Sequence, residues 1–358
     1  MLAVPNVSEG RDRKLIERMA EAFDAWLLNV HSDPDHHRSV FTLAGGPGRL
    51  AQFVLAGAAV ATAEIDIMHQ QGVHPRIGAI DVAPIVYLRQ ADRGAACAEA
   101  LLLGDLLGEE LKLAVFLYGE LAQGRTRAEL RRGGPDTLAR RMRAGELQAD
   151  FGPGQPHPSA GAVLVTARPP LVAFNVELAP PATRETARAV AGAIREGGPE
   201  GLPQVRALGV WLEHRGVAQV SMNVEDHTRV RLAEVVSAIR RHAPLAEAEL
   251  VGLAPQAALE DFPPSPCSCS SSKLLLTPVQ GDLKVFFAAF GGREKGKKRG
   301  MQAPQACLPR APQGDGCPLD PCLRRLFNRC SRRWLRLYCV NKKKGVFYEI
   351  TQLYRSWK

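Results

Sequence analysis

The segment QQGVHPRIGAID, residues 70–81, contains a histidine in a setting that suits proton transfer. His74 is followed directly by Pro75 and Arg76, and a glycine lies on either side of this group. Pro75 fixes its own φ angle and restricts His74 to extended conformations, while the glycines let the chain turn. An imidazole titrates near neutral pH, so it can accept and donate a proton. The pattern fits a general acid–base, and also a loop histidine that only helps the chain to turn.

A second polar segment, HSDPDHHRSV at residues 31–40, holds three imidazoles, two carboxylates and Arg38. These side chains are metal ligands by type. However, alternate positions in a turn rarely converge on one ion, and the chain shows no HExxH helix or paired CxxC motif. Contact with a polar substrate and an ordinary Asp-Pro turn are better interpretations, and both stay open. Arg38 is the member best suited to binding, because a guanidinium can hold a carboxylate through two hydrogen bonds.

A third segment, DFGPGQPHPSAG at residues 150–161, contains three prolines and three glycines. Such a composition predicts either a linker or an ordered loop that covers a ligand. Exposed glycine amides in such a loop would suit a planar heterocycle with amide and carboxylate edges.

The elements around these segments form a repeated pattern. A helix with one buried face is expected at residues 11–26 and an Ala-rich helix at residues 49–67. Strands are expected at residues 2–7, 27–30, 39–44 and 81–89, which gives the order βαββαβ. A helix at residues 91–111 and a strand at residues 114–119 follow, and residues 119–160 are mostly helix and loop.

The same order recurs after residue 170. Strands are expected at residues 171–178, 205–213, 217–224 and 246–254, the middle two forming a hairpin, with helices at residues 182–196 and 227–243. We therefore predict an α/β (α+β) fold of two consecutive ferredoxin-like βαββαβ-type subdomains. Helices should cover one face of each sheet, and a ligand cleft should lie between the subdomains.

Charge and cysteines separate the last quarter of the 358-residue chain from the rest. Residues 265–358 hold 19 Lys and Arg against 5 Asp and Glu, a net +14, so the remaining 27 basic and 32 acidic groups give residues 1–264 a net −5. Seven of the eight cysteines also lie after residue 265, which leaves Cys97 alone in the first part. One cysteine suits a reducing, cytoplasmic location and excludes a disulfide framework there. Apolar runs are too short for a membrane helix, and no secretory signal is seen.

Nucleic-acid binding is not expected of residues 1–264, because their net charge is negative and their strands display too few aromatic residues for base stacking. We predict that residues 265–358 are an aberrant segment, from a frameshift or read-through, and mostly disordered. A genuine basic arm is the alternative.

Taken together, the motifs resemble those of the formiminotransferase family, the glutamate formimidoyltransferases, whose members also form the N-terminal part of formiminotransferase-cyclodeaminase. The resemblance covers residues 1–262 in the family's order. Its motifs are VPNVSEGR at 4–11, SDPDHHRSVFT at 32–42, GVHPRIGAIDVAP at 72–84, VFLYGE at 115–120, DFGP at 150–153, LVAFNVEL at 171–178, VAQVSMNVED at 217–226 and ELVGLAP at 249–255.

The resemblance implies transfer of a formimino group between N-formimino-L-glutamate and tetrahydrofolate in histidine degradation, with tetrahydrofolate as co-substrate and no metal. It implies that His74 is the catalytic general acid–base. It also implies that folate contacts the loop formed by Gly152, Pro153, Gly154, Gln155, Pro156, His157, Pro158, Ser159, Ala160 and Gly161. Charge and position add Arg38, Arg76, His37 and Asn6 as substrate-binding residues.

The domain boundaries expected from this reading are 1–169 for an N-terminal subdomain, 170–264 for a C-terminal one and 265–358 for the tail. A homodimer and a separate cyclodeaminase are the expected partners. The chain departs from the family's usual residues at Val73, His37, Ala160 and Met222. Formyl transfer between glutamate and folate, and folate binding without catalysis, are therefore the alternative functions.

Overall fold

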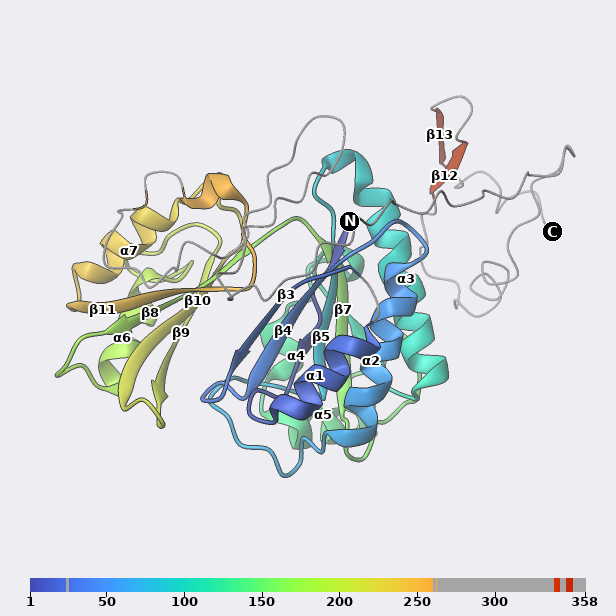
Figure 1. The fold of residues 1–358 in the computed structure, drawn as a ribbon, viewed down its shortest axis with the longest axis horizontal. Coiled ribbons are helices and arrows are strands. Elements are labelled where there is room, and N and C mark those ends of the chain that lie inside the picture. Colours follow the sequence, from blue (N-terminus) through green and yellow to red (C-terminus); the bar gives the residue numbers. More distant parts are fainter. Residues whose placement is uncertain (24–25, 260–261, 263–337, 342–345, 350–358) are drawn as a thin grey trace, which may run out of the picture. The chain divides into compact units, whose positions relative to one another are not determined.

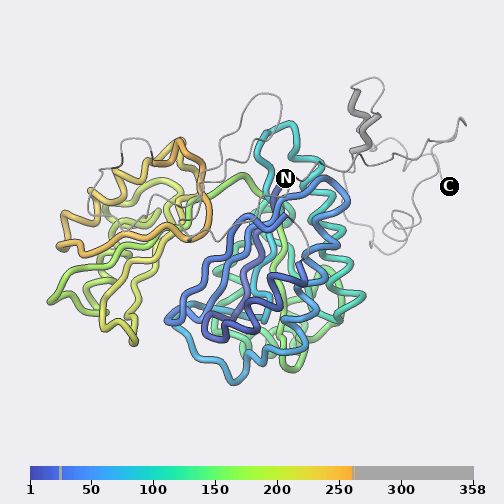
Figure 2. The backbone as a smooth tube through the Cα atoms, viewed as in Figure 1, coloured from blue at the N-terminus to red at the C-terminus, as the bar shows by residue number. Residues whose placement is uncertain are grey.

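The computed structural model describes residues 1–23, 26–259, 262, 338–341 and 346–349. It divides into two compact units, Met1–Ala288 and Ala289–Lys358. The first unit contains two sheets (Figure 1), and Figure 2 traces the backbone through them. Each sheet has its own hydrophobic core.

The first sheet has seven strands, in the order β3-β4-β1/β2-β5-β7-β6. β1 and β2 each pair with both β4 and β5, so they act as one interrupted strand, whereas β5, β7 and β6 run parallel. The strands are β1 (Leu2–Ala3), β2 (Asn6–Val7), β3 (Trp26–Asp33), β4 (Arg38–Ala44), β5 (Ile80–Val86), β6 (Ala114–Leu117) and β7 (Ala162–Arg168). The helices are α1 (Arg13–Ala22), α2 (Leu50–Glu64), α3 (Arg93–Glu110), α4 (Arg127–Arg131) and α5 (Gly134–Arg143), with short 3₁₀ turns η1 (Gln90–Asp92) and η2 (Gly119–Ala122).

Alternating residues of the parallel strands pack on both sides of this sheet. Val115 and Val163 belong to the core shared with α1, α2 and α3, whereas their neighbours Phe116 and Leu164 pack with residues of α4 and α5. Successive side chains of a strand point to opposite faces, so helices cover both faces here. The prediction of helices on one face is wrong for this sheet, because β6 and β7 extend it and bring a second helical layer.

The second sheet has four antiparallel strands in the order β11-β8-β10-β9. Phe174, Val220 and Met222 are buried in the core that the sheet shares with its helices, while the alternate position Gln219 lies outside this core. The elements are β8 (Val172–Leu178), α6 (Arg184–Ile194), β9 (Val205–Leu212), β10 (Val217–Val224), α7 (Leu232–Arg240), β11 (Leu245–Val251) and the 3₁₀ turn η3 (Gln256–Leu259).

Both subdomains therefore share one topology. In each βαββαβ unit the fourth strand pairs with the first, the first with the third, and the third with the second, which is the order of the split βαβ motif. The predicted fold class of two consecutive α+β subdomains is confirmed, and so is the hairpin of β9 and β10.

One predicted loop is largely strand. β3 continues to Asp33 and β4 begins at Arg38, so the polar segment of residues 31–40 forms a hairpin with a four-residue turn, residues 34–37. His37 ends this turn with a φ of 50°, in the left-handed region that residues other than glycine rarely adopt. The turn thus presents consecutive polar side chains at the end of two paired strands.

The second unit contributes one pair of antiparallel strands, β12 (Tyr338–Asn341) and β13 (Val346–Glu349). The predictions for residues 265–358 otherwise fall outside the described residues. Among the helices that are described, none combines the length and apolarity needed to cross a membrane.

Candidate functional site

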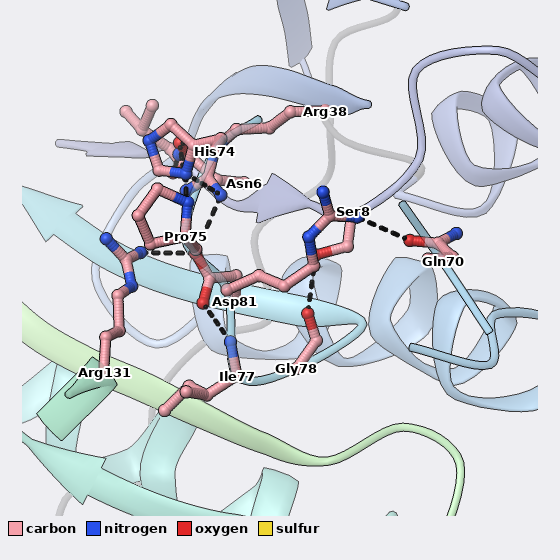
Figure 3. Close-up of polar contacts among 12 residues, drawn as sticks. Asn6, Ser8, Arg38, Gln70, His74, Pro75, Ile77, Gly78, Asp81 and Arg131 are labelled. Atoms are coloured by element: carbon pink, nitrogen blue, oxygen red, sulfur yellow. Dashed lines mark hydrogen bonds and ion pairs between the residues drawn. The ribbon is translucent and has the colours of Figure 1, made fainter. Parts of the chain in front are cut away.

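Asp81 is the centre of a buried charge cluster in the first sheet. It lies at the start of β5, is fully buried, and binds Arg38 Nη1 through Oδ2 at 2.7 Å. Arg131 of α4 donates to the same oxygen, and the Ile77 amide donates to Oδ1 at 3.0 Å (Figure 3). Burial alone would raise the pKa of Asp81, but the two arginines and these hydrogen bonds outweigh it and hold the pKa below its usual value. The carboxylate is therefore ionised and fixed.

Arg38 is held by protein groups on several sides. Its Nε and Nη2 donate to Asn6 Oδ1 at 3.2 and 3.1 Å, and Asn6 is itself fixed through its own amide hydrogen bond to the Val4 carbonyl at 2.8 Å. Burial lowers the pKa of Arg38 to about 10, so it keeps its charge at neutral pH. The structure thus places the predicted substrate residues Arg38 and Asn6 side by side, with Arg38 already bound to the carboxylate of Asp81.

His74 lies directly beside this cluster. Its Nδ1 is 3.2 Å from Arg38 Nη1 and 2.8 Å from the Pro75 carbonyl oxygen. One nitrogen cannot satisfy both, because arginine can only donate and a carbonyl can only accept. The shorter contact favours a proton on Nδ1, donated to Pro75. This tautomer, assigned from geometry, leaves the lone pair of Nε2 available to accept a proton.

The surroundings of His74 keep its ring neutral. Burial lowers the pKa of His74 well below its usual value of 6.5, and the charges of Arg38, Arg131 and His36 lower it further, against a small opposing effect of the Pro75 carbonyl. The residue nevertheless keeps part of its surface exposed. A neutral, partly accessible imidazole at neutral pH has the protonation state that a general base requires.

The turn of residues 34–37 contributes two more histidines. His36 Nε2 lies 2.7 Å from Gln219 Oε1 of β10, and its ring centre is 6.1 Å from that of His74. His37 Nδ1 accepts from the Gly10 amide at 3.1 Å. Burial lowers the pKa of His37, with Glu9 acting in the opposite sense. Neutral His37 therefore carries its proton on Nε2.

Arg76 differs from Arg38 in having an unsatisfied donor. Its Nη1 donates to Gln70 Oε1 at 3.1 Å, but its Nη2 is buried without a hydrogen-bond partner among the described residues. The whole residue is 9% exposed. An unpaired buried donor of a charged group costs about 1–3 kcal/mol or more, so this nitrogen suits an anionic group supplied by a ligand.

The loop of residues 152–161 ends against the strand that follows His74. The Ala79 amide donates to the Ala160 carbonyl at 2.8 Å, and the Ile67 amide donates to the Ser159 carbonyl at 3.0 Å. Gly161 has a φ of +70°, and a Cβ there would lie 2.2 Å from the Ile77 carbonyl oxygen. The loop is thus ordered at this end rather than a free linker.

The rest of the loop is fixed at its start and open in its middle. Gly152 has a φ of +76°, and a Cβ there would lie 2.1 Å from the Leu113 carbonyl oxygen. Gly154 and Gln155 are exposed, and His157 closes the loop by exchanging two backbone hydrogen bonds with Gly161 at 2.8 and 2.9 Å. Both ends therefore need glycine for steric reasons, while the middle is free to meet a ligand.

The sequence did not single out Asp81, Arg131 or Gln219. A signal existed for Asp81, since it is an acidic residue in the otherwise apolar run IDVAPIV and so needs a buried partner. Gln219 gave a weaker signal, because it is one of the polar residues that alternate with apolar residues along β10. Arg131 gave none, because α4 carries several arginines nearby. No group of three or more His, Cys, Asp or Glu suited to hold a metal occurs among the described residues.

Comparisons with known proteins show the family of this chain. Residues 1–168 match the family model described as formiminotransferase domain, N-terminal subdomain, and residues 173–262 match formiminotransferase domain. The chain is 36% identical to formimidoyltransferase-cyclodeaminase of Rattus norvegicus over 307 residues, 80% of this chain but 56% of that protein. It therefore spans about half the length of the cyclodeaminase relatives.

Two shorter relatives are covered almost completely. Glutamate formimidoyltransferase of Thermoplasma acidophilum is 34% identical, with 72% of this chain and 89% of that protein aligned. The protein of the same name from Streptococcus pyogenes is 32% identical, with 72% and 90% aligned. The two family models match both subdomains in order. The chain belongs to the formiminotransferase family.

Proposed function

We propose that the protein transfers a formimino group between N-formimino-L-glutamate and tetrahydrofolate, giving 5-formimidoyltetrahydrofolate and L-glutamate, in histidine degradation. The names of the Thermoplasma acidophilum and Streptococcus pyogenes relatives support formimidoyl transfer. The observation that carries the proposal is the neutral, partly exposed imidazole of His74, held beside a fixed Asp81–Arg38 pair.

The reaction needs one group that takes a proton and returns it. The folate amine attacks the formimino carbon, which becomes tetrahedral and bears both nitrogens. The attacking nitrogen then gives its proton to Nε2 of His74. The protonated His74 next donates this proton to the glutamate nitrogen, whose bond to the carbon breaks as glutamate leaves. A base whose pKa lies below neutrality is ready for the first step and becomes a strong acid for the second.

The cations around His74 make the second step favourable. Arg38 and Arg131 disfavour an imidazolium between them, so the protonated state is short-lived and the proton moves on to the leaving nitrogen. Asp81 balances the charge of both arginines and keeps them in place. We therefore assign Arg38, and Asn6 through Arg38, to the frame that holds His74.

Arg76 is the residue that we propose to bind a carboxylate of the glutamate part of the donor. Its buried Nη2 lacks a partner within the described structure, and a carboxylate would satisfy it through a charge-assisted hydrogen bond. His37, whose proton lies on Nε2, is a second donor. It lies close enough to Arg76 for the charge of this arginine to lower its pKa. Arg76→Met should raise KM for the formimino donor while leaving KM for tetrahydrofolate nearly unchanged. An equal rise in both would contradict this assignment.

The folate contact is proposed for residues 152–161. Glycine is sterically required at both ends of this loop, the exposed middle offers unhindered backbone amides, and its last residues are hydrogen-bonded to the strand after His74. A folate bound there would lie near the proposed acid–base. We also propose that a ligand cleft lies between the two subdomains.

His74→Ala tests the acid–base role. Turnover should fall by about 10²–10⁴-fold, the usual contribution of a positioned acid–base, while tetrahydrofolate should still bind in a fluorescence titration. The matched control is His69→Ala, since this side chain is 85% exposed and pairs with Asp66 at the surface; it should retain full activity. Equal turnover in the His74 variant and the parent would remove His74 from the mechanism. N-formyl-L-glutamate, supplied as the donor, distinguishes formyl from formimino transfer.

The remaining expectations are proposals as well. The matched ranges support boundaries near residues 169 and 264, and one cysteine before residue 265 suits a cytoplasmic location. A separate cyclodeaminase would supply the activity named in the longer relatives. The exposed Trp26, on the edge strand β3, gives the proposed homodimer a surface to use. Sedimentation velocity of the full chain tests that last point.

A further inference from the structure

One arginine of the second subdomain binds three carboxylates. Arg215 lies in the turn between β9 and β10. Its Nη2 is 3.0 Å from Asp33 Oδ2, its Nε is 3.4 Å from Asp35 Oδ2, and its Nη1 is 2.5 Å from Glu177 Oε1. Asp33 and Asp35 belong to the first subdomain, whereas Glu177 belongs to β8 of the second. Each nitrogen of the guanidinium thus has its own carboxylate.

Both aspartates connect this arginine to the candidate site. Asp35 accepts the His214 amide through Oδ1 at 2.8 Å, and its backbone carbonyl accepts the amide of Val73, the residue before His74, at 3.2 Å. Asp33 Oδ1 accepts the amide of His36 at 2.7 Å. The turn that Arg215 binds is therefore hydrogen-bonded to the loop that carries His74.

The attachment of this turn depends on Arg215, because Arg215 supplies the positive charge between three carboxylates. The side chains of Asp33, Asp35 and Glu177 are 12%, 2% and 11% exposed. Carboxylates with so little solvent repel each other strongly unless a cation lies between them. Without Arg215 they would repel each other, and the turn of residues 34–37 would be held less firmly, by its remaining hydrogen bonds alone. Arg215 itself is 37% exposed, so solvent screening reduces its energetic contribution but leaves the geometry it imposes.

We propose that Arg215 is a positioning residue, which fixes the loop bearing His74 from the second subdomain through Asp33 and Asp35. The role in turnover rests on the proposed function. Gln219, which lies in the same β9–β10 hairpin as Arg215, also holds this turn, because its Oε1 lies 2.7 Å from His36 Nε2. A displacement of the imidazole by about 1 Å lowers turnover by about 10²-fold without removing any substrate contact, so Arg215 should affect kcat far more than KM.

The test uses full-length Arg215→Met and Arg215→Lys variants. The matched control is Arg184→Met, which removes an arginine of the same subdomain whose partner, Glu213 at 2.9 Å, is exposed. Hydrogen–deuterium exchange should accelerate at the amides of Val73 and His36 in Arg215→Met, and stay unchanged in the control. In the transfer assay kcat should fall by about 10²-fold, with KM for tetrahydrofolate little changed and partial recovery in Arg215→Lys.

A double-mutant cycle with Asp35→Asn shows whether Arg215 acts through this aspartate. The effects on kcat should be strongly non-additive. Unchanged amide exchange overturns the proposal, as does faster exchange with unchanged kcat in an active parent. A rise in KM alone with additive effects would mean that Arg215 contacts substrate, and also overturns it. If the parent chain shows no transfer at all, the proposed function fails, and the exchange data still decide whether Arg215 holds the loop.

Discussion

Asp81→Asn removes one charge from the buried cluster and changes the shape of the side chain very little. Asparagine can still accept the Ile77 amide through its oxygen. Its NH₂ group, however, would face the guanidinium groups of Arg38 and Arg131 in place of an oxygen that accepts from both. Arg38, itself 9% exposed, would lose the counter-charge that compensates its burial.

The size of the effect follows from this burial. Removing one partner of a buried ion pair leaves an uncompensated charge, which costs about 3–5 kcal/mol. The matched control is Asp92→Asn, in which the arginine partner, Arg89 at 2.8 Å, is 63% exposed. A surface pair of this kind contributes about 0–1 kcal/mol. The free energy of unfolding, measured by urea denaturation with circular dichroism, should therefore fall several times more for Asp81→Asn than for Asp92→Asn.

The difference in unfolding free energy between the parent and Asp81→Asn should depend on pH in a defined direction. Because the folded protein lowers the pKa of Asp81 below its unfolded value of 3.8, the stabilisation is complete above that value and is lost as the pH falls through the lowered pKa. The difference between parent and Asp81→Asn should thus persist from pH 7 down to about 3.8 and shrink only in stronger acid. Equal losses for the two variants at pH 7 would refute the buried cluster.

Two further predictions concern the histidine and the loop. Arg131→Met removes a cation that lowers the pKa of His74, so this pKa should rise and the acid limb of the pH profile of kcat/KM should move to higher pH. The control Arg132→Met, at an exposed position, should leave the acid limb in place. An acid limb that is unmoved in both variants would contradict the assignment. Gly161→Ala forces a Cβ into a left-handed backbone conformation at 2.2 Å from a carbonyl oxygen, so unfolding free energy should fall by at least about 1–2 kcal/mol and KM for tetrahydrofolate should rise. Gly46→Ala, outside this loop, has no atom within 4 Å of the new Cβ and should change neither quantity; similar behaviour of the two glycine variants would show that the end of the loop tolerates a side chain.

Hydrophobic periodicity predicted most of the architecture because it reflects burial directly. The alternation that buries Phe174 and Val220 but leaves Gln219 outside that core marked the second sheet as half covered, and the glycine after Arg215 marked its hairpin. Helix was expected within residues 119–160, but its place on the second face of the first sheet was missed, because a helical period marks the buried side of α5 and not the sheet face it covers, and because α4 has only five residues and one buried side chain, Leu130. Five residues are too few for a helical period to appear in a sequence.

The candidate site was predictable only where its chemistry is local. The proline after His74 is a local signal, and so are the glycines of the loop at residues 152–161. Asp81 meets Arg38 across 43 positions of sequence, and Gln219 meets His36 across 183. Contacts of this range arise when strands pair and sheets face each other, and no local pattern encodes them. The sequence thus singled out His74 as a candidate acid–base but not the groups that keep its ring neutral.

The hydrogen bonds from residues 214 and 219 to the hairpin turn have a consequence for synthesis of the protein. The ribosome completes the His74 segment long before it reaches these residues, so a nascent chain with a finished first sheet still lacks part of the framework around the imidazole. The proposed transfer can reach its full rate only after the β9–β10 hairpin has been synthesised. A truncated product that stops near residue 205 would keep the histidine and lack both of these hydrogen bonds.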